Sequence, residues 1–335
     1  GFYEGIRTKQ STFWIVGIFF AAILILGIRL FGLQIIEGST YRVMAEENRL
    51  RSGVILAPRG LLLDRYGKTL AANTASFNLV ATPFDLPKEG VPELVAALSK
   101  VFNFDQQEAK ALVGRSGNSS LEPVVIKQDV AVQEAILFET KALEFPGFSI
   151  KSIPVRDYKN AEMFSHVLGY AGIVNENELK DLRSQGYQAS DYIGKAGIEL
   201  SYENYIRGTN GQERVEVNAL GRPVNVLGTL DPKPGNTVSL TIDKELQEHI
   251  YKEFIKLSPR IRGAAIALDP KTGAVLALLS LPGFNNNLFA HGISQSDYQN
   301  LITDKTLPLF DRAISGTYPP GSTVKPMVGL AALEN

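Results

Sequence analysis

The chain has no cysteine among its 335 residues, and it has only three histidines, three methionines and one tryptophan. Without cysteine there is no disulfide, no cysteine-ligated metal and no thiol nucleophile. His166, His249 and His291 are far apart and fit neither HxxxH nor HExxH spacing. We therefore expect no metal and no other cofactor, and we interpret the histidines as ordinary surface or core residues.

The chain also lacks an excess of charge of either sign. It has 34 Lys and Arg against 35 Asp and Glu, a net charge of −1, and no block of basic residues. Binding to nucleic acid is therefore not expected. Apolar residues at 44% and charged residues at 21% are typical of globular domains, and the length is sufficient for two of them.

One long apolar run lies near the N-terminus. Residues 13–33 give about 31 Å of helix, which matches the hydrocarbon core of a bilayer. A signal peptide would have a shorter apolar run and a small-residue cleavage site, and a soluble core helix would have a polar face. We predict a transmembrane anchor at 13–36 after a cytoplasmic stub at 1–12. The charge count does not settle its orientation, because basic residues flank the run on both sides: Arg7, Lys9, Arg42, Arg49 and Arg51.

The long segment 37–235 alternates helical and strand-like patterns and predicts a mixed α+β domain. Residues 91–102 predict a helix, and a second helix begins at Asp105 as its cap. Strands are expected near 124–127 and 148–155. In the first helix we expect one buried face, formed by Leu94, Leu98 and Val101.

Glycine is frequent between residues 169 and 222, but no nucleotide-binding motif is present there. Gly194 and Gly197 fit neither GxGxxG nor GxxxxGK[ST], so we expect them to serve turns and close packing. The following DPKPGN, residues 231–236, has the composition of a linker. We place the domain boundary at its end.

Residues 236–335 show a different pattern. Asp243 predicts the cap of a helix that ends near Leu257. The apolar runs in 264–280 are joined by DPKTG and predict a β-hairpin covered on both faces. Another helix is expected at 294–303. The apolar face of the first helix is expected to comprise Leu246, Ile250, Phe254 and Leu257.

The chain contains one chemically suggestive spacing, Ser322-x-x-Lys325. About one such match is expected by chance in a chain of this length, and a capping serine with a solvated lysine is the commoner arrangement. Here Pro319, Pro320 and Gly321 delay a helix, so Ser322 falls in its first turn with Lys325 on the same face. A lysine whose pKa is lowered can remove the serine proton, and the helix N-terminus favours a developing oxyanion. The helix is expected to bury Val324, Val328, Leu330 and Ala331.

The wider context favours the reactive pair. YPPGSTVKP, with LAPRGLLLDRYGKTLA, GYAGIVNENEL, GKAGIELSYENYIRG and VEVNALGR, closely resembles the class B penicillin-binding proteins, and among them the elongation-type transpeptidases. The resemblance implies an α+β multidomain protein with one transmembrane helix. It further implies a pedestal (dimerisation-type) domain at 37–235 and the N-terminal part of a serine β-lactamase-like α/β sandwich at 236–335. It places the main domains on the periplasmic side of the bacterial inner membrane.

The same resemblance implies a peptidoglycan D,D-transpeptidase of cell elongation and shape maintenance. Ser322 would be the acyl-ester nucleophile and Lys325 the general base for acylation. The substrates would be stem peptides that end in D-Ala-D-Ala, and β-lactams would acylate the same serine. Membrane proteins of wall elongation would be partners through the pedestal.

The family also needs a Ser-x-Asn and a Lys-Thr-Gly motif after the serine. Lys271–Gly273, Ser76–Asn78 and Ser116–Asn118 have these compositions but precede Ser322, so we interpret all three as unrelated to catalysis. We therefore expect a truncated and inactive chain. A β-lactam sensor or β-lactamase, or a non-catalytic membrane scaffold of wall synthesis, remains an alternative.

Overall fold

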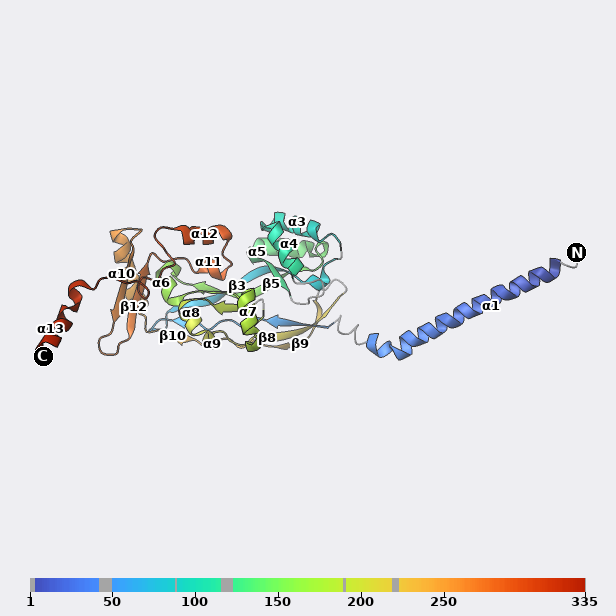
Figure 1. Ribbon diagram of the computed structural model, residues 1–335, viewed down its shortest axis with the longest axis horizontal. Coiled ribbons are helices and arrows are strands. Elements are labelled where there is room, and N and C mark those ends of the chain that lie inside the picture. Colours follow the sequence, from blue (N-terminus) through green and yellow to red (C-terminus); the bar gives the residue numbers. More distant parts are fainter. Residues whose placement is uncertain are drawn as a thin grey trace. The chain divides into compact units, whose positions relative to one another are not determined.

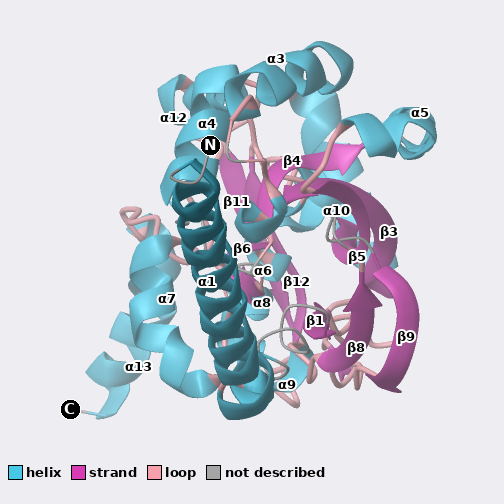
Figure 2. Cartoon of the chain, turned by 90° about the vertical axis from the view of Figure 1, so that its right-hand side faces the viewer, coloured by secondary structure: helices cyan, strands magenta, loops and turns pink. Residues whose placement is uncertain are grey.

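The computed structural model describes residues 4–41, 50–87, 89–115, 123–188, 191–218 and 223–334. The chain divides into two compact units, Gly1–Gly53 with Glu213–Thr229, and Val54–Gln212 with Leu230–Asn335. Helices and strands are mixed in the second unit (Figures 1 and 2). The predicted α+β class is confirmed.

The first unit begins with a long apolar helix. α1 spans Glu4–Phe31 and continues as the π-helical turn η1, Gly32–Ile36. Its segment Ile18–Ile36 has 19 residues, a mean hydropathy of 2.3 and no buried side chains. An apolar helix of this length can cross a bilayer, which agrees with the predicted anchor.

The remainder of this unit is largely a three-stranded sheet. Its strands are β1 (Leu50–Ile55), β8 (Gly211–Val217) and β9 (Pro223–Leu230), in the order β1-β8-β9. β8 buries Val215 and Val217, whereas β9 is exposed from Val224 to Leu230. β9 therefore forms an exposed edge of this sheet.

The second unit is organised around a five-stranded sheet. The order is β10-β2-β3-β4, and β5 also pairs with β3. β3 and β5 are antiparallel partners from Ala71 opposite Tyr158 to Ala81 opposite Phe148. Both strands predicted in this region are confirmed. The strand bounds are β2 Leu62–Leu63, β3 Thr69–Ala81, β4 Val124–Val130, β5 Phe148–Tyr158 and β10 Val238–Ser239.

Two hydrophobic clusters lie along this long β3–β5 ladder. One cluster, which contains Leu79 and Phe148, is covered by α3 (Val91–Phe102), α4 (Gln106–Arg115) and α5 (Val132–Lys141). α4 contacts β4 and α5 contacts β5, so the three helices gather beside these strands (Figure 2). The other cluster contains Leu70 and Tyr158 and extends to Leu279, Leu281 and Ala290.

The predicted helix at 91–102 is confirmed, but its predicted buried face is wrong in part. Val95, Leu98 and Phe102 are buried, whereas Val101 is 39% exposed. The predicted residues (Leu94, Leu98 and Val101) and the buried residues (Val95, Leu98 and Phe102) both have helical spacing. The buried face includes the large ring of Phe102 and therefore removes more apolar surface from water. The cap at Asp105 is confirmed, because its carboxylate accepts hydrogen bonds from the backbone N–H groups of Gln107 and Glu108.

The glycine-rich region folds into short, tightly packed elements. A Cβ on Gly169 would lie 1.9 Å from the Ala196 carbonyl oxygen, and one on Gly194 would lie 2.1 Å from the Glu199 oxygen. Only glycine permits such approaches, so the close-packing interpretation is confirmed. The elements are α6 Ala161–Leu168, β6 Ala171–Ile173, α7 Glu176–Leu182, β7 Tyr192–Gly194, α8 Gly197–Ser201 and α9 Glu203–Ile206, with 3₁₀ turns at Pro83–Asp85, Ala142–Glu144 and Arg183–Gln185.

The segment 231–236 is packed onto its neighbours. Gly235 donates its N–H to the Pro58 carbonyl, and Asn236 donates to that of Tyr205. Lys233 and Thr209 form an antiparallel bridge. The proline and glycine content therefore serves close packing here, and the domain boundary at this position stays a prediction.

The C-terminal elements include the predicted hairpin and helices. The hairpin pairs β11 (Gly263–Leu268) with β12 (Val275–Leu281) in antiparallel register. Its predicted coverage on both faces is wrong, because Ile266 and Leu268 of β11 are exposed. The remaining elements are α10 Lys244–Leu257, α11 Asn287–Ala290, α12 Gln295–Thr303, the 3₁₀ turn η5 Gly321–Val324 and α13 Lys325–Glu334.

Helix α10 also departs from its predicted face. Asp243 caps it as expected, with its side chain accepting from the Leu246 N–H. However, Leu257 is 77% exposed, whereas Gln247 is fully buried. The Gln247 amide donates to the Met163 carbonyl and accepts from the Leu278 N–H, both at 3.0 Å. Burial is tolerated because both ends of the amide are hydrogen-bonded.

Candidate active site

Ser322 and Lys325 lie where a 3₁₀ turn passes into an α-helix. Ser322 belongs to η5, and Lys325 is the first residue of α13. Gly321 has a φ of +55°, a conformation that favours glycine, and the Thr323 hydroxyl donates to the Pro320 carbonyl. The predicted helix therefore begins with one tighter turn, and Pro326 is accommodated in the first turn of α13.

The side chains of this segment are exposed. Ser322 and Lys325 are both accessible, and the predicted burial of Val324, Val328 and Leu330 is wrong within this chain. A lysine needs burial or a neighbouring positive charge to become an effective base. The pairing of Ser322 with Lys325 as nucleophile and base stays a prediction.

A cavity lies just before this segment. Its volume is about 740 Å³, and it opens between β11 and residues 312–318. Arg312 contributes to its wall, but the guanidinium is occupied by the carbonyls of Thr306, Leu307 and Phe310. Arg312 therefore holds the loop that leads to Ser322. The lining residues are Arg262, Gly263, Ala264, Ile266, Arg312, Ala313, Gly316 and Tyr318.

Three sequences have the composition of the later family motifs. Two of them lie in the described residues, and both have structural roles there. Lys271–Gly273 occupies the hairpin turn, where Asp269 accepts from the Lys271 N–H and the Thr272 hydroxyl. Ser76 and Asn78 lie in β3, and both hold Asp129 through hydrogen bonds of 3.0 and 3.1 Å. Their interpretation as non-catalytic agrees with these contacts. Ser116–Asn118 lies outside the described residues.

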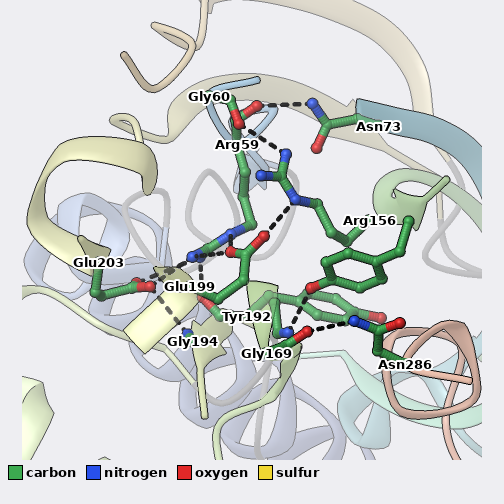
Figure 3. Close-up of polar contacts among 12 residues, drawn as sticks. Arg59, Gly60, Asn73, Arg156, Gly169, Tyr192, Gly194, Glu199, Glu203 and Asn286 are labelled. Atoms are coloured by element: carbon green, nitrogen blue, oxygen red, sulfur yellow. Dashed lines mark hydrogen bonds and ion pairs between the residues drawn. The ribbon is translucent and has the colours of Figure 1, made fainter. Parts of the chain in front are cut away.

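A densely bonded polar cluster is buried in the second unit. It comprises Arg59, Arg156, Glu199 and Glu203 and is here called the ion network (Figure 3). Glu199 is fully buried and receives both arginines: Arg59 Nε lies 2.9 Å from one carboxylate oxygen and Arg156 Nε lies 2.6 Å from the other. Arg59 Nη2 also donates to Glu203 at 2.6 Å. Two guanidinium groups and two carboxylates thus balance in charge.

Backbone groups also bond to the ion network. Arg156 donates to the Gly60 carbonyl at 2.7 Å, and Glu203 accepts from the Gly194 N–H at 2.9 Å. Burial by itself would lower the pKa of Arg59, but Glu199 and the hydrogen-bonded Glu203 raise it above its ordinary value. Burial, reinforced by Glu199, likewise raises the pKa of Tyr158 well above its ordinary range. Arg59 and Tyr158 therefore keep their protons; Arg59 donates to both carboxylates, and the Tyr158 hydroxyl accepts from the Ala171 N–H at 2.8 Å.

The ion network was not predicted as a set. Arg59 lies in the motif LAPRG, and Glu199 and Glu203 lie in GKAGIELSYE, where charges interrupt apolar or glycine-rich sequence; Arg156 directly follows the strand predicted at 148–155. Such isolated charges were the available signal, because a charge in an apolar setting needs a partner when it is buried. Their mutual pairing depends on contacts across 140 and 144 residues of chain.

The histidines also have ordinary surroundings. The His166 ring meets Phe284 edge-on with centroids 5.4 Å apart, and burial lowers the pKa of His166. His291 Nδ1 lies 3.2 Å from the Asp129 carboxylate. Within the described ranges, no group of three or more histidine and acidic side chains could hold a metal.

Comparison with known families decides the assignment. Residues 54–240 match the Penicillin-binding Protein dimerisation domain, and residues 263–335 match the Penicillin binding protein transpeptidase domain. The chain belongs to the penicillin-binding proteins. The two matches follow each other in the order expected from the resemblance.

Named relatives of this penicillin-binding protein agree. Peptidoglycan D,D-transpeptidase MrdA of Acinetobacter baumannii is 35% identical over 327 residues, which is 97% of this chain and 48% of that protein. MrdA of Escherichia coli K12 is 34% identical over 310 residues, 91% of this chain and 48% of its own length. The chain thus spans about half the length of these relatives.

A solved structure shows the same fold. It is a complex between the penicillin-binding protein PBP2 and MreC from Helicobacter pylori, with a TM-score of 0.71 and 31% identity. The match covers 85% of this chain and 53% of that one. The predicted resemblance to elongation-type members of the family, penicillin-binding protein 2 in particular, is confirmed.

Proposed function

We propose that this chain is part of a membrane-anchored peptidoglycan D,D-transpeptidase in which Ser322 is the acylated nucleophile. The observation that carries the proposal is the Ser322-x-x-Lys325 spacing at a helix start, within the segment matched to the transpeptidase domain. Relatives named as D,D-transpeptidases align over most of the chain and support it.

The chemistry follows from the positions of the two side chains. Lys325 Nζ accepts the proton of the Ser322 hydroxyl while Oγ bonds to the carbonyl carbon of the penultimate D-alanine. The peptide bond to the terminal D-alanine breaks, and that amino acid leaves as the protonated amine. The amine of a neighbouring stem then attacks the ester and forms the cross-link, and the proton that this amine loses passes to Ser322 Oγ as the ester bond breaks. A β-lactam undergoes the first step as a substrate mimic.

The exposure of Lys325 and the positions of the later family motifs both bear on this function. Lys325 is exposed here, so an effective base requires further residues to cover it. The family's Ser-x-Asn and Lys-Thr-Gly motifs, which follow the nucleophile, are not found after Ser322 in these 335 residues.

Localisation and partners follow from the anchor and the relatives. α1 spans the inner membrane once in this proposal, with both large domains on the periplasmic side. The related PBP2 was solved with MreC. We propose that a wall-elongation membrane protein likewise binds the pedestal at 37–235.

The test is covalent labelling with a fluorescent penicillin. A longer version that carries the later motifs should be acylated, and peptide mapping should place the label on Ser322. The Ser322→Ala variant of the longer version should remain unlabelled, with unchanged thermal unfolding.

Two other outcomes would overturn parts of the proposal. Rapid turnover of the β-lactam by the longer version would indicate a β-lactamase. Absence of any label in a folded longer version would indicate a non-catalytic scaffold.

A further inference from the structure

Arg312 holds its guanidinium against a stretch of irregular backbone, residues 304–320, which lies between α12 and Ser322. Arg312 is 7% exposed, and its Nη1 donates to the carbonyls of Leu307 and Phe310 at 3.0 and 3.3 Å. Its Nη2 donates to the Thr306 carbonyl at 2.6 Å. The planar fork of an arginine has several fixed donors, so one side chain gathers three carbonyls of the same loop.

The conformation of this loop is not favoured by its own residues. Leu307 has a φ of +51°, in the left-handed region that bulky side chains rarely adopt. Its side chain is 53% exposed, so burial does not hold it there. Its N–H donates to the Asp304 carbonyl at 2.9 Å, and its own carbonyl accepts from Arg312. A strained backbone persists only where its surroundings fix it, and Arg312 supplies one of these fixing contacts.

Arg312 also ties the loop to strand β12 of the hairpin. Its backbone N–H donates to Ser280 Oγ at 2.8 Å, and Ser280 is a buried residue of β12. The Ser280 hydroxyl in turn lies 3.5 Å from the Phe310 carbonyl, which the guanidinium also contacts. The loop is therefore attached to β12 through both the backbone and the side chain of one residue.

The chain between Arg312 and Ser322 has little conformational freedom. A Cβ on Gly316 would lie 2.6 Å from the Arg312 carbonyl oxygen and 2.6 Å from the Tyr318 ring, so glycine is required at this position. Pro319 and Pro320 follow, and their rings fix φ. The placement of Arg312 on β12 is thus carried along a short and restricted segment to Ser322.

We propose that Arg312 is a positioning residue, which fixes the place of Ser322 relative to β12 for acylation. This inference rests on the proposed acylation of Ser322. Nucleophilic attack requires close approach and alignment of the reacting atoms, and a displacement of about 1 Å can slow a reaction about 10²-fold. Arg312 acts through the backbone that it holds, so its fork of donors is required and its charge alone is not sufficient.

The first test measures the placement directly and does not depend on transpeptidase activity. Because the chain has no cysteine, Lys271→Cys in the hairpin turn and Met327→Cys on α13 can carry a pair of spin labels at exposed positions. In the 335-residue chain in detergent, Arg312→Ala should make the distance distribution between the labels roughly two-fold broader or more. Arg262→Ala is the matched control and should leave the distribution unchanged. Arg262 lines the same cavity, but in the described part of the chain no hydrogen bond joins its side chain to residues 304–320.

The second test measures acylation in a longer version that carries the later motifs. Arg312→Ala should lower the first-order rate of Ser322 acylation at saturating penicillin about 10- to 100-fold. The dissociation constant of the noncovalent penicillin complex should stay the same, because the nucleophile is displaced and the bound ligand is not. Arg312→Lys should lose as much as Arg312→Ala, since one ammonium group does not reproduce the fork of donors. Arg262→Ala should keep the parent rate.

The outcomes separate this inference from the proposed function. If the parent longer version is not acylated, the proposed function fails, and the label distances still show whether Arg312 places Ser322. If the parent is acylated, an unchanged distance distribution or an unchanged acylation rate in a folded Arg312→Ala variant overturns the positioning role. Full acylation of Arg312→Lys also overturns it, because charge alone would then be sufficient.

A milder variant keeps the test available if Arg312→Ala does not fold. Ser280→Ala removes only the acceptor of the Arg312 N–H and leaves the guanidinium contacts in place. It should broaden the label distances and slow acylation in the same direction, by a smaller factor than Arg312→Ala. A folded Ser280→Ala variant with the distances and the rate of the parent would contradict the proposal.

Discussion

The ion network and the Ser322–Lys325 segment hold their charged and reactive groups in opposite ways. Arg59, Arg156 and Glu199 are buried and hydrogen-bonded on several sides, so each is fixed in one position. Ser322 and Lys325 lie one helical turn apart on an exposed segment. The paired buried charges of the ion network support the fold, whereas a reactive pair needs a vacant side for substrate. Buried charge by itself therefore does not identify an active site.

The largest effect is expected at Lys325. In a longer version that carries the later motifs, Lys325→Ala should slow acylation of Ser322 by penicillin about 10²- to 10⁴-fold, because general base catalysis is lost. Stopped-flow fluorescence would measure the rate. Lys271→Ala, in the hairpin turn, is the control; an equal loss there would contradict the assignment of Lys325.

The second effect concerns stability. Glu199→Ala removes the shared acceptor of two buried arginines and should lower the free energy of unfolding by about 3–5 kcal/mol. Chemical denaturation of the 335-residue chain in detergent would measure it. Glu245→Ala, which removes an exposed partner of Lys68, should have no measurable effect. If Glu199→Ala and Glu245→Ala lower the free energy of unfolding by similar amounts, buried ion pairs do not stabilise this protein more than exposed ones.

A neutral buried group should give an intermediate effect. Gln247→Ala leaves the Met163 carbonyl and the Leu278 N–H without their partners and should cost about 1–3 kcal/mol. The same denaturation experiment applies. His249→Ala, on the exposed side of the same helix, should not alter stability. If Gln247→Ala lowers the free energy of unfolding no more than His249→Ala does, water takes the place of the Gln247 amide as the hydrogen-bond partner of these two backbone groups.

The smallest effect is a pH dependence at Asp64. Burial would raise the pKa of this carboxyl, but the backbone N–H groups of Lys68, Tyr66 and Lys244 outweigh it and lower the pKa below 3.8. A lowered folded-state pKa gives stability that is present above the unfolded value and is lost as pH falls through the folded value. Asp64→Asn should cost about 1 kcal/mol at neutral pH, because hydrogen bonds to an ionised acceptor are the stronger ones.

Its measurement is the free energy of unfolding between about pH 3 and pH 7. The variant should show a flatter acid limb than the parent. Asp304→Asn is the control, because the pKa of that carboxyl is also lowered by local hydrogen bonds but its side chain is exposed. An identical acid limb in parent and Asp64→Asn would show that other carboxylates govern acid unfolding.

Local patterns in the sequence determined much of this protein. The apolar length of residues 13–33 predicted a helix that can span a bilayer, and capping side chains located helix starts at Asp105 and Asp243. The hairpin at 264–280 followed from its turn residues. Caps and turns depend on neighbouring residues, which the sequence states directly.

Tertiary structure decided which faces are covered and which charges meet. Val101 and Leu257 satisfy helical periodicity but remain exposed, because burial depends on the opposing surface. Gln247 is buried because a carbonyl and an N–H from distant segments complete its amide. Arg59 finds Glu199 across 140 residues, a pairing that no local pattern encodes. The sequence determined the elements and the family motifs, and only the fold decided their partners, since contact between distant residues is a property of the packed chain.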